Sequence, residues 1–211
     1  MKTIKLVLLG APGAGKGTLA QELCQDLHLK HISVGDILRD NMKNKTELGE
    51  KASQYIANGQ LAPDDLIVEL IKIRLSETDC KNGYVLDGYP RTIKQAEELD
   101  KIDTITNVIN IDVDNAVIVD RIVNRLVCSQ CGAIYNRRWG NAEVCPKCDG
   151  SFKVRNDDKE EIVLTRLAVY DKETKPLLDY YKGKSYFKNI DGNTTPDVVL
   201  EKVKGVINDN N

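Results

Sequence analysis

The strongest constraint in this sequence is a glycine-rich loop close to its start. A short apolar run from Ile4 to Leu9 precedes the segment Gly10 to Lys16, which fits G-x-x-x-x-G-K, and Leu19, Leu23 and Leu27 follow with helical spacing. A strand, a tight loop and a helix in this order direct backbone N–H groups, the helix dipole and the lysine ammonium at one point. We therefore predict a phosphate cradle, the alternative being a purely structural turn.

The rest of the chain alternates between apolar runs and helical stretches. Further short runs lie at Tyr84 to Leu86, Val108 to Val113 and Tyr186 to Ile190. This alternation favours an α/β fold in which helices cover both faces of a parallel sheet, with ligands at the carboxyl ends of the strands. Residues 33–62 and 124–158 break the pattern, and we interpret them as insertions into a core. A chain of 211 residues is expected to form only one such core.

Composition narrows the class of protein further. Hydrophobic residues make up 41% and charged residues 29%, which is typical of a soluble globular chain rather than a disordered or membrane protein. The net charge of −2 and the pI of about 5.8 provide no global basic field, so we expect no nucleic-acid partner. We expect no export signal and a cytoplasmic location.

Four of the six cysteines form two C-x-x-C pairs thirteen residues apart, and the other two stand alone. The pairs are Cys128 with Cys131 and Cys145 with Cys148. Two such turns suit a tetrahedral zinc site of four thiolates, which would be structural because no position is left for water. Iron or two disulfides remain the alternatives.

Several segments together resemble adenylate kinase, in its long bacterial form with a zinc-binding lid. They are G-A-P-G-A-G-K-G-T from Gly10, I-S-V-G-D-I-L-R from Ile32, L-D-G-Y-P-R-T from Leu86, I-V-D-R-I-V-N-R from Ile118, and R-N-D-D-K-E-E from Arg155. The resemblance implies a P-loop nucleoside monophosphate kinase fold. Its core would comprise residues 1–32, 63–123 and 159–211, with a monophosphate-binding domain at 33–62 and a lid at 124–158.

The resemblance also implies an activity, reversible phosphoryl transfer from ATP to AMP giving two ADP with Mg²⁺, and a monomeric state. It assigns the ATP side to Gly13, Ala14, Gly15, Lys16, Gly17, Thr18, Arg121, Arg125 and Tyr135. It assigns the AMP side to Ser33, Val34, Arg39, Gln60, Leu61, Ala62, Gly88, Tyr89, Pro90, Arg91, Gln95, Arg155 and Arg166. The catalytic residues it implies are Lys16, Arg91, Arg125, Arg155 and Arg166.

Phosphoryl transfer requires several positively charged groups at the site, which the implied arginines and Lys16 would provide. Its loose transition state spreads charge over phosphate oxygens, which guanidinium groups meet two at a time. Arg121 and Arg125 are four residues apart, which predicts one helix face, and Arg91 is expected in a loop after a strand. A solvated or ion-paired surface group is the alternative for any single arginine. Asp36 and Asp87, both expected in loops, are the candidates to hold Mg²⁺ through water, although Asp36 could instead cap a helix.

Some residues are expected to have structural roles only. Two alternatives for the function also remain. Asp157 with Glu160 resembles a helix-capping pair, and His31 is expected at the surface. Gln95 favours adenine by resemblance, but Val34 stands where adenylate kinases often have threonine, so UMP, CMP or GMP are possible acceptors. A zinc-ribbon ATPase that grips nucleic acid is the alternative from another class, with Arg137 to Trp139 as its basic and aromatic cluster.

Overall fold

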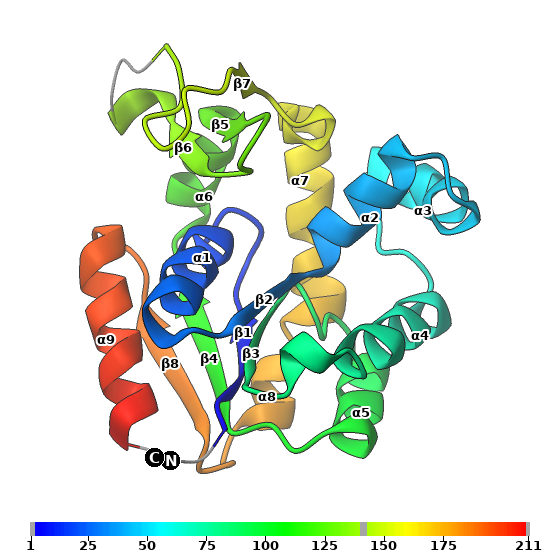
Figure 1. Cartoon of the computed structure of the whole chain (residues 1–211), viewed down its shortest axis with the longest axis vertical. Coiled ribbons are helices and arrows are strands. Elements are labelled where there is room, and N and C mark those ends of the chain that lie inside the picture. The colour runs from blue at the N-terminus through cyan, green and yellow to red at the C-terminus, as the bar shows by residue number, and fades with distance from the viewer. Residues whose placement is uncertain (1–2, 140–142, 210–211) are drawn as a thin grey trace.

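The computed structural model describes residues 3–139 and 143–209, and Figure 1 shows the course of the chain. The first half contains β1 Lys5–Leu9, α1 Lys16–Leu27, β2 Lys30–Ser33, α2 Val34–Lys43, α3 Glu47–Ala57, α4 Asp64–Leu75, β3 Tyr84–Asp87, α5 Ile93–Ile102 and β4 Asn107–Asp112. The second half contains α6 Asn115–Val123, β5 Arg125–Cys128, β6 Ile134–Asn136, β7 Phe152–Lys153, α7 Glu160–Val169, α8 Leu177–Tyr181, β8 Phe187–Asp191 and α9 Pro196–Asp209.

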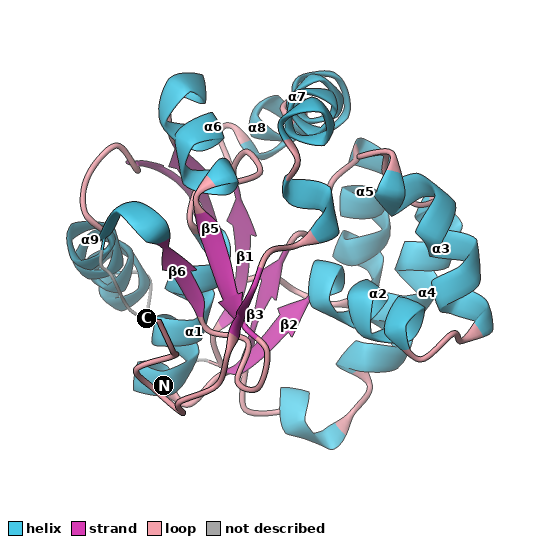
Figure 2. Ribbon diagram, turned by 90° about the horizontal axis from the view of Figure 1, so that it is seen from above, coloured by secondary structure: helices cyan, strands magenta, loops and turns pink. Residues whose placement is uncertain are grey.

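Within the described residues, the main sheet has five strands in the order β2-β3-β1-β4-β8, and every neighbouring pair is parallel. The central strand β1 explains why both faces are covered. Leu6 and Leu8 point to one face, Val7 and Leu9 point to the other, and all four are buried. Helices therefore lie on both sides of the sheet, as Figure 2 shows from above. The predicted α/β fold is confirmed.

Each face of the sheet has its own hydrophobic core. One core joins the sheet to α4, α5 and α8 and continues into α2 and α3. The other core joins the sheet to α1, α6, α7 and α9. Among the helices that the structure describes, none combines the length and the apolar character needed to cross a bilayer.

Two groups of elements extend beyond the sheet. Helices α2 and α3 pack on each other closely at Gly49, where a Cβ atom would lie 2.2 Å from the carbonyl oxygen of Asn41. Further along the chain, β5 pairs antiparallel with β6 and β7 to form a separate small sheet that carries the cysteines. Both groups lie above the carboxyl ends of the main strands (Figure 1).

The predicted strands agree with the structure to within a residue or two, apart from β2. That strand was not predicted, because only Ile32 of its four residues is fully buried and its sequence Lys-His-Ile-Ser carries no apolar run. It lies at the edge of the main sheet, next to β3. Its position matters because it brings Ser33 to the same edge of the sheet as Asp87, the last residue of β3.

Candidate active site

A cavity of about 640 Å³ opens where the parallel strands end. It is lined by the glycine-rich loop after β1, by the start of α2 and by residues of the small sheet, including Leu126, Ile134 and Tyr135. The carboxyl edge of a parallel sheet is the usual place for ligands in α/β proteins. The sequence prediction located the site there.

The loop is shaped by close contacts that only glycine permits. Gly13 has a φ of 84°, and a Cβ atom on it would lie 2.6 Å from Cγ1 of Ile122 in α6. Lys16, the first residue of α1, folds back over the loop, where its Nζ donates to the carbonyl oxygens of Gly10 at 2.8 Å and Ala11 at 2.9 Å. The ammonium group is therefore held at the N-terminal end of a helix, where phosphate oxygens are stabilised.

The charge around Lys16 is strongly positive. Burial lowers the pKa of Lys16 to about 8, and although Asp87 opposes this shift, Arg91, Arg166 and Arg125 lower the pKa further. Burial is the main cause of this shift, and the three arginines place further positive charge around the lysine. The cavity is thus suited to a polyanion.

Six arginines line the cavity together with Lys16: Arg39, Arg91, Arg121, Arg125, Arg155 and Arg166. Carboxylates hold several of them in place. Arg125 Nε donates to Asp158 Oδ2 at 2.8 Å, its Nη2 contacts the other oxygen, and the Asp158 side chain has no solvent exposure. Arg166 Nη1 lies 3.0 Å from the Asp157 carboxylate. This pairing fixes where the guanidinium groups point.

Asp36 is held between two of these arginines. It lies in the first turn of α2, and not in a loop as predicted, with Ser33 as the residue that caps the helix. Its Oδ1 is 2.5 Å from Arg39 Nη2 and 3.5 Å from Arg155 Nη2. Burial lowers the pKa of Arg155 to about 10, with Arg39 and Arg125 adding to the effect. The geometry gives Asp36 a clear part in positioning these two guanidinium groups.

Asp87 lies at the end of β3, again not in a loop, with His31 of β2 beside it. Burial opposes ionisation of Asp87, but His31, Lys16 and Arg91 outweigh burial and keep the pKa of this carboxyl below its usual range. His31 Nε2 is 3.5 Å from Asp87 Oδ2, and only 20% of the His31 side chain is exposed. The prediction of a surface histidine is therefore wrong. An ionised carboxylate beside the phosphate cradle is the type of group that holds the waters of Mg²⁺.

A smaller pocket adjoins the main cavity and shares Arg39, Arg91 and Arg166 with it. Besides these guanidinium groups, Gln60, Gln95 and Asp157 line it together with several apolar residues. Its apolar lining residues are Val34, Leu38, Ile56, Leu61, Ala62 and Ile67. A pocket that offers apolar side chains, amide groups and cations shared with the main cavity has the chemistry that a base joined to a monophosphate requires.

The remaining predicted residues occupy different positions. Gly13, Gly15, Gly17, Thr18, Ser33, Gly88, Pro90 and Tyr135 line the main cavity, and Gln60 lines the smaller pocket. Ala14 and Tyr89 are buried, with 4% and 0% exposure, and belong to the hydrophobic cores beneath the site. Arg121 Nη2 donates to the carbonyl oxygen of Gly192 at 3.1 Å.

Two local predictions about the arginines and their partners are wrong. Helix α6 ends at Val123 and Arg125 begins β5, so Arg121 and Arg125 do not share a helix face, although both reach the cavity. Asp157 does not cap α7, whose start has no side-chain cap. It pairs with Arg166 instead.

Sequence patterns also missed part of the lining. Val169, Tyr170 and Thr174 reach the cavity from the end of α7 and the π-helical turn Tyr170–Thr174 that follows it. No motif marks these residues. A π-helical turn is itself a frequent companion of functional sites, but it becomes visible only in the structure.

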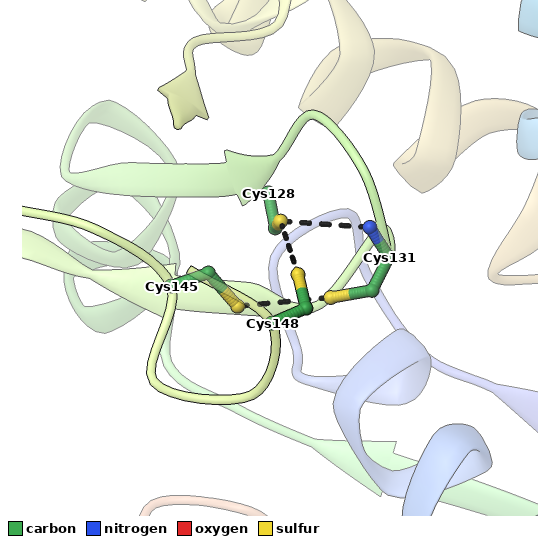
Figure 3. A group of neighbouring side chains, drawn as sticks. All are labelled: Cys128, Cys131, Cys145 and Cys148. Atoms are coloured by element: carbon green, nitrogen blue, oxygen red, sulfur yellow. Dashed lines mark hydrogen bonds between the residues drawn. The ribbon is translucent and has the colours of Figure 1, made fainter. Parts of the chain in front are cut away.

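The four paired cysteines converge in the small sheet, as Figure 3 shows. Their sulfur atoms lie within 4.8 Å of one another, with Cys128 and Cys148 3.4 Å apart and Cys131 and Cys145 3.7 Å apart. A tetrahedral zinc site with Zn–S distances of about 2.3 Å has sulfur–sulfur edges of roughly 3.8 Å, so the arrangement fits zinc. None of the six cysteines, all of which the structure describes, forms a disulfide.

Comparison with known proteins agrees with this geometry. The sequence model of the family described as adenylate kinase matches residues 8–186. The adenylate kinase of Caldanaerobacter subterraneus subsp. tengcongensis is 47% identical over 209 residues, 95% of each chain. That of Caldicellulosiruptor bescii is 50% identical over 189 residues, 86% of this chain and 88% of the relative. The chain belongs to the adenylate kinase family.

Proposed function

We propose that this protein transfers the terminal phosphoryl group of ATP to AMP, reversibly, to give two ADP. The observation that carries the proposal is the convergence of six arginines and Lys16 on one cavity, beside a smaller pocket that combines apolar side chains with the amide of Gln95. Membership of the adenylate kinase family supports the same reaction. Neither the alternative acceptors nor a nucleic-acid-binding ATPase is favoured by the family match.

We assign the ATP phosphates to the glycine-rich loop, from Gly13 to Thr18, with Lys16 as its cation. Arg121, Arg125 and Tyr135 would also contact ATP, because all three line the same cavity. We assign AMP to the smaller pocket, where Val34 and Gln95 would meet the base and Arg39 its phosphate. Under this assignment the two nucleotides would approach each other from adjoining pockets, as in-line transfer requires.

Arg91, Arg125, Arg155 and Arg166, together with Lys16, would carry the transfer step. Charge builds up on the oxygens of the transferred group, and prepositioned guanidinium groups stabilise it more strongly than water does. No separate base is needed, because the accepting phosphate oxygen is already ionised. Closure of residues 124–158 and 33–62 over the cavity would exclude water, which would otherwise accept the phosphoryl group.

We assign two metals different places in this scheme. Asp87, with Asp36 as the second candidate, would hold waters of a Mg²⁺ ion, and this ion supplies charge neutralisation on the ATP phosphates when bound. One zinc ion at the four cysteines would be structural, since four protein ligands fill its coordination sphere. The zinc would stabilise residues 124–158, the segment we propose as the lid.

We further propose a monomer that works in the cytoplasm, where thiols stay reduced; the free cysteines support this location. A coupled assay of ADP formation tests the main proposal. ADP should form from ATP only when AMP is added, and much more slowly with UMP, CMP or GMP. Formation of ADP that does not depend on AMP, or a strong preference for UMP, would overturn it.

A further inference from the structure

The amide of Gln95 is held by two partners that allow only one orientation. Gln95 Oε1 accepts from the backbone N–H of Arg91 at 2.8 Å, and Gln95 Nε2 donates to Asp64 Oδ1 at 2.7 Å. A backbone N–H can only donate, and an ionised carboxylate can only accept. Turning the amide over would face donor against donor and oxygen against oxygen, so both hydrogen bonds would be lost.

The surrounding backbone is fixed by the same network. Thr92 Oγ1 donates to Asp64 Oδ1 at 3.1 Å and accepts from the backbone N–H of Gln95 at 3.2 Å. Tyr89 donates from its hydroxyl to the carbonyl oxygen of Gln95 at 3.1 Å. Asp64, the first residue of α4, therefore joins the start of that helix to the start of α5. Gln95 itself is 2% exposed.

The hydrogen-bonding groups of the Gln95 amide that are not used within the protein determine which base it can recognise. One lone pair on Oε1 and one N–H on Nε2 are left for a ligand in the smaller pocket, which Gln95 lines. The Watson–Crick edge of adenine presents an N–H donor at N6 beside an acceptor at N1. Hypoxanthine and guanine present the reverse, an acceptor at O6 beside a donor at N1.

We propose that Asp64 is a specificity-determining residue, which selects adenine over 6-oxopurines by fixing the orientation of the Gln95 amide. This inference rests on the proposed function, because it concerns the base of the AMP acceptor. Asp64 touches no nucleotide in this scheme and is a positioning residue. Without the Asp64 carboxylate, the Gln95 amide can rotate by half a turn and loses only its hydrogen bond to Arg91. In that orientation it can pair with the inverted edge of a 6-oxopurine.

The neighbouring residue supplies a matched control. Asp65 carries the same charge in the same first turn of α4, so it interacts with the helix dipole in the same way. Its carboxylate instead pairs with Lys94 at 2.7 Å on the surface, where the two side chains are 86% and 56% exposed. An effect that appears at Asp64 and not at Asp65 therefore comes from the contact with Gln95.

The experiment compares AMP with inosine monophosphate, which presents the inverted edge without an added amino group. The ratio of kcat/KM for AMP to that for inosine monophosphate is measured in the wild type and in Asp64→Ala, Asp64→Asn and Asp65→Ala. We expect Asp64→Ala to lower the ratio roughly tenfold, the effect of a hydrogen bond to a charged group. Asp64→Asn keeps a carbonyl acceptor and should keep the ratio, as should Asp65→Ala.

The ratio separates specificity from stability, because a partly unfolded variant loses both activities in proportion. Asp64→Ser, which keeps a residue suited to a helix start, replaces the alanine variant if that variant does not fold. An unchanged ratio in both truncations, or an equal loss in Asp64→Asn, would overturn the inference. A wild type that does not use AMP would instead refute the proposed function.

Discussion

Replacing Asp158 by asparagine should destabilise the protein far more than its small change in shape suggests. The carboxylate is fully buried and lies against Arg125 and Arg166. Removing one partner of a buried ion pair leaves the other charge uncompensated, at a cost of about 3–5 kcal/mol. We expect about 3 kcal/mol, the lower end of that range, because the Arg125 and Arg166 side chains are 11% and 20% exposed and Arg166 keeps its pairing with Asp157.

For a chain of this length, that loss lowers Tm by on the order of 10 °C, which thermal unfolding followed by circular dichroism measures directly. Asp171→Asn is the control, because Asp171 pairs with Lys175 at the surface, with 52% and 62% exposure. Its loss should change stability by less than about 1 kcal/mol. Saturating ATP should narrow the gap between Asp158→Asn and the wild type, since its phosphates supply the missing negative charge. Equal Tm values for Asp158→Asn and Asp171→Asn would refute the reasoning. So would a difference in Tm between Asp158→Asn and the wild type that ATP does not change.

Three further predictions follow from the site. A strong chelator should lower Tm by several degrees, as should Cys145→Ser, and unchanged melting of metal-free protein would contradict a structural zinc. Burial lowers the pKa of Lys16 to about 8, from 10.5 in the unfolded chain, so the lysine is charged below that pH and neutral above it. The value of kcat/KM for ATP should therefore fall as the pH rises from 7 to 9.5. A value that does not change with pH would exclude a role for this ammonium group. Gly13→Ala should raise KM for ATP and lower stability by about 1–3 kcal/mol, since the new Cβ would lie 2.6 Å from Ile122 at a φ of 84°; a variant that melts and binds ATP like the wild type would show that the loop adapts.

Local sequence patterns predicted much of the fold, because glycine in tight loops and apolar residues in buried strands reflect strong physical preferences. The loop from Gly10 to Lys16 needs glycine for its shape, and β4 buries the apolar side chains of Val108, Ile109 and Ile111. Edge strand β2 escaped prediction because it has a single fully buried residue, Ile32. The helix expected to carry Arg125 ends early, at Val123, as the chain leaves the core for the small sheet.

The candidate site was predictable where a residue lies within a motif and unpredictable where tertiary packing decides. The placement of His31 beside Asp87 depends on the pairing of β2 with β3, which no local pattern encodes. Asp157 has the spacing of a helix cap, but pairing with Arg166 stabilises a buried guanidinium and prevails. The contact of Asp64 with Gln95 likewise joins residues thirty-one positions apart.

The reaction itself provides the most direct test of the central claim, that one cavity brings two nucleotides together for phosphoryl transfer. Phosphorus NMR of a mixture of ATP, AMP, Mg²⁺ and the protein follows every species at once. We predict that two ADP appear for each AMP consumed, and that ADP alone returns to the same equilibrium mixture. Release of inorganic phosphate from ATP with AMP left unchanged would contradict it.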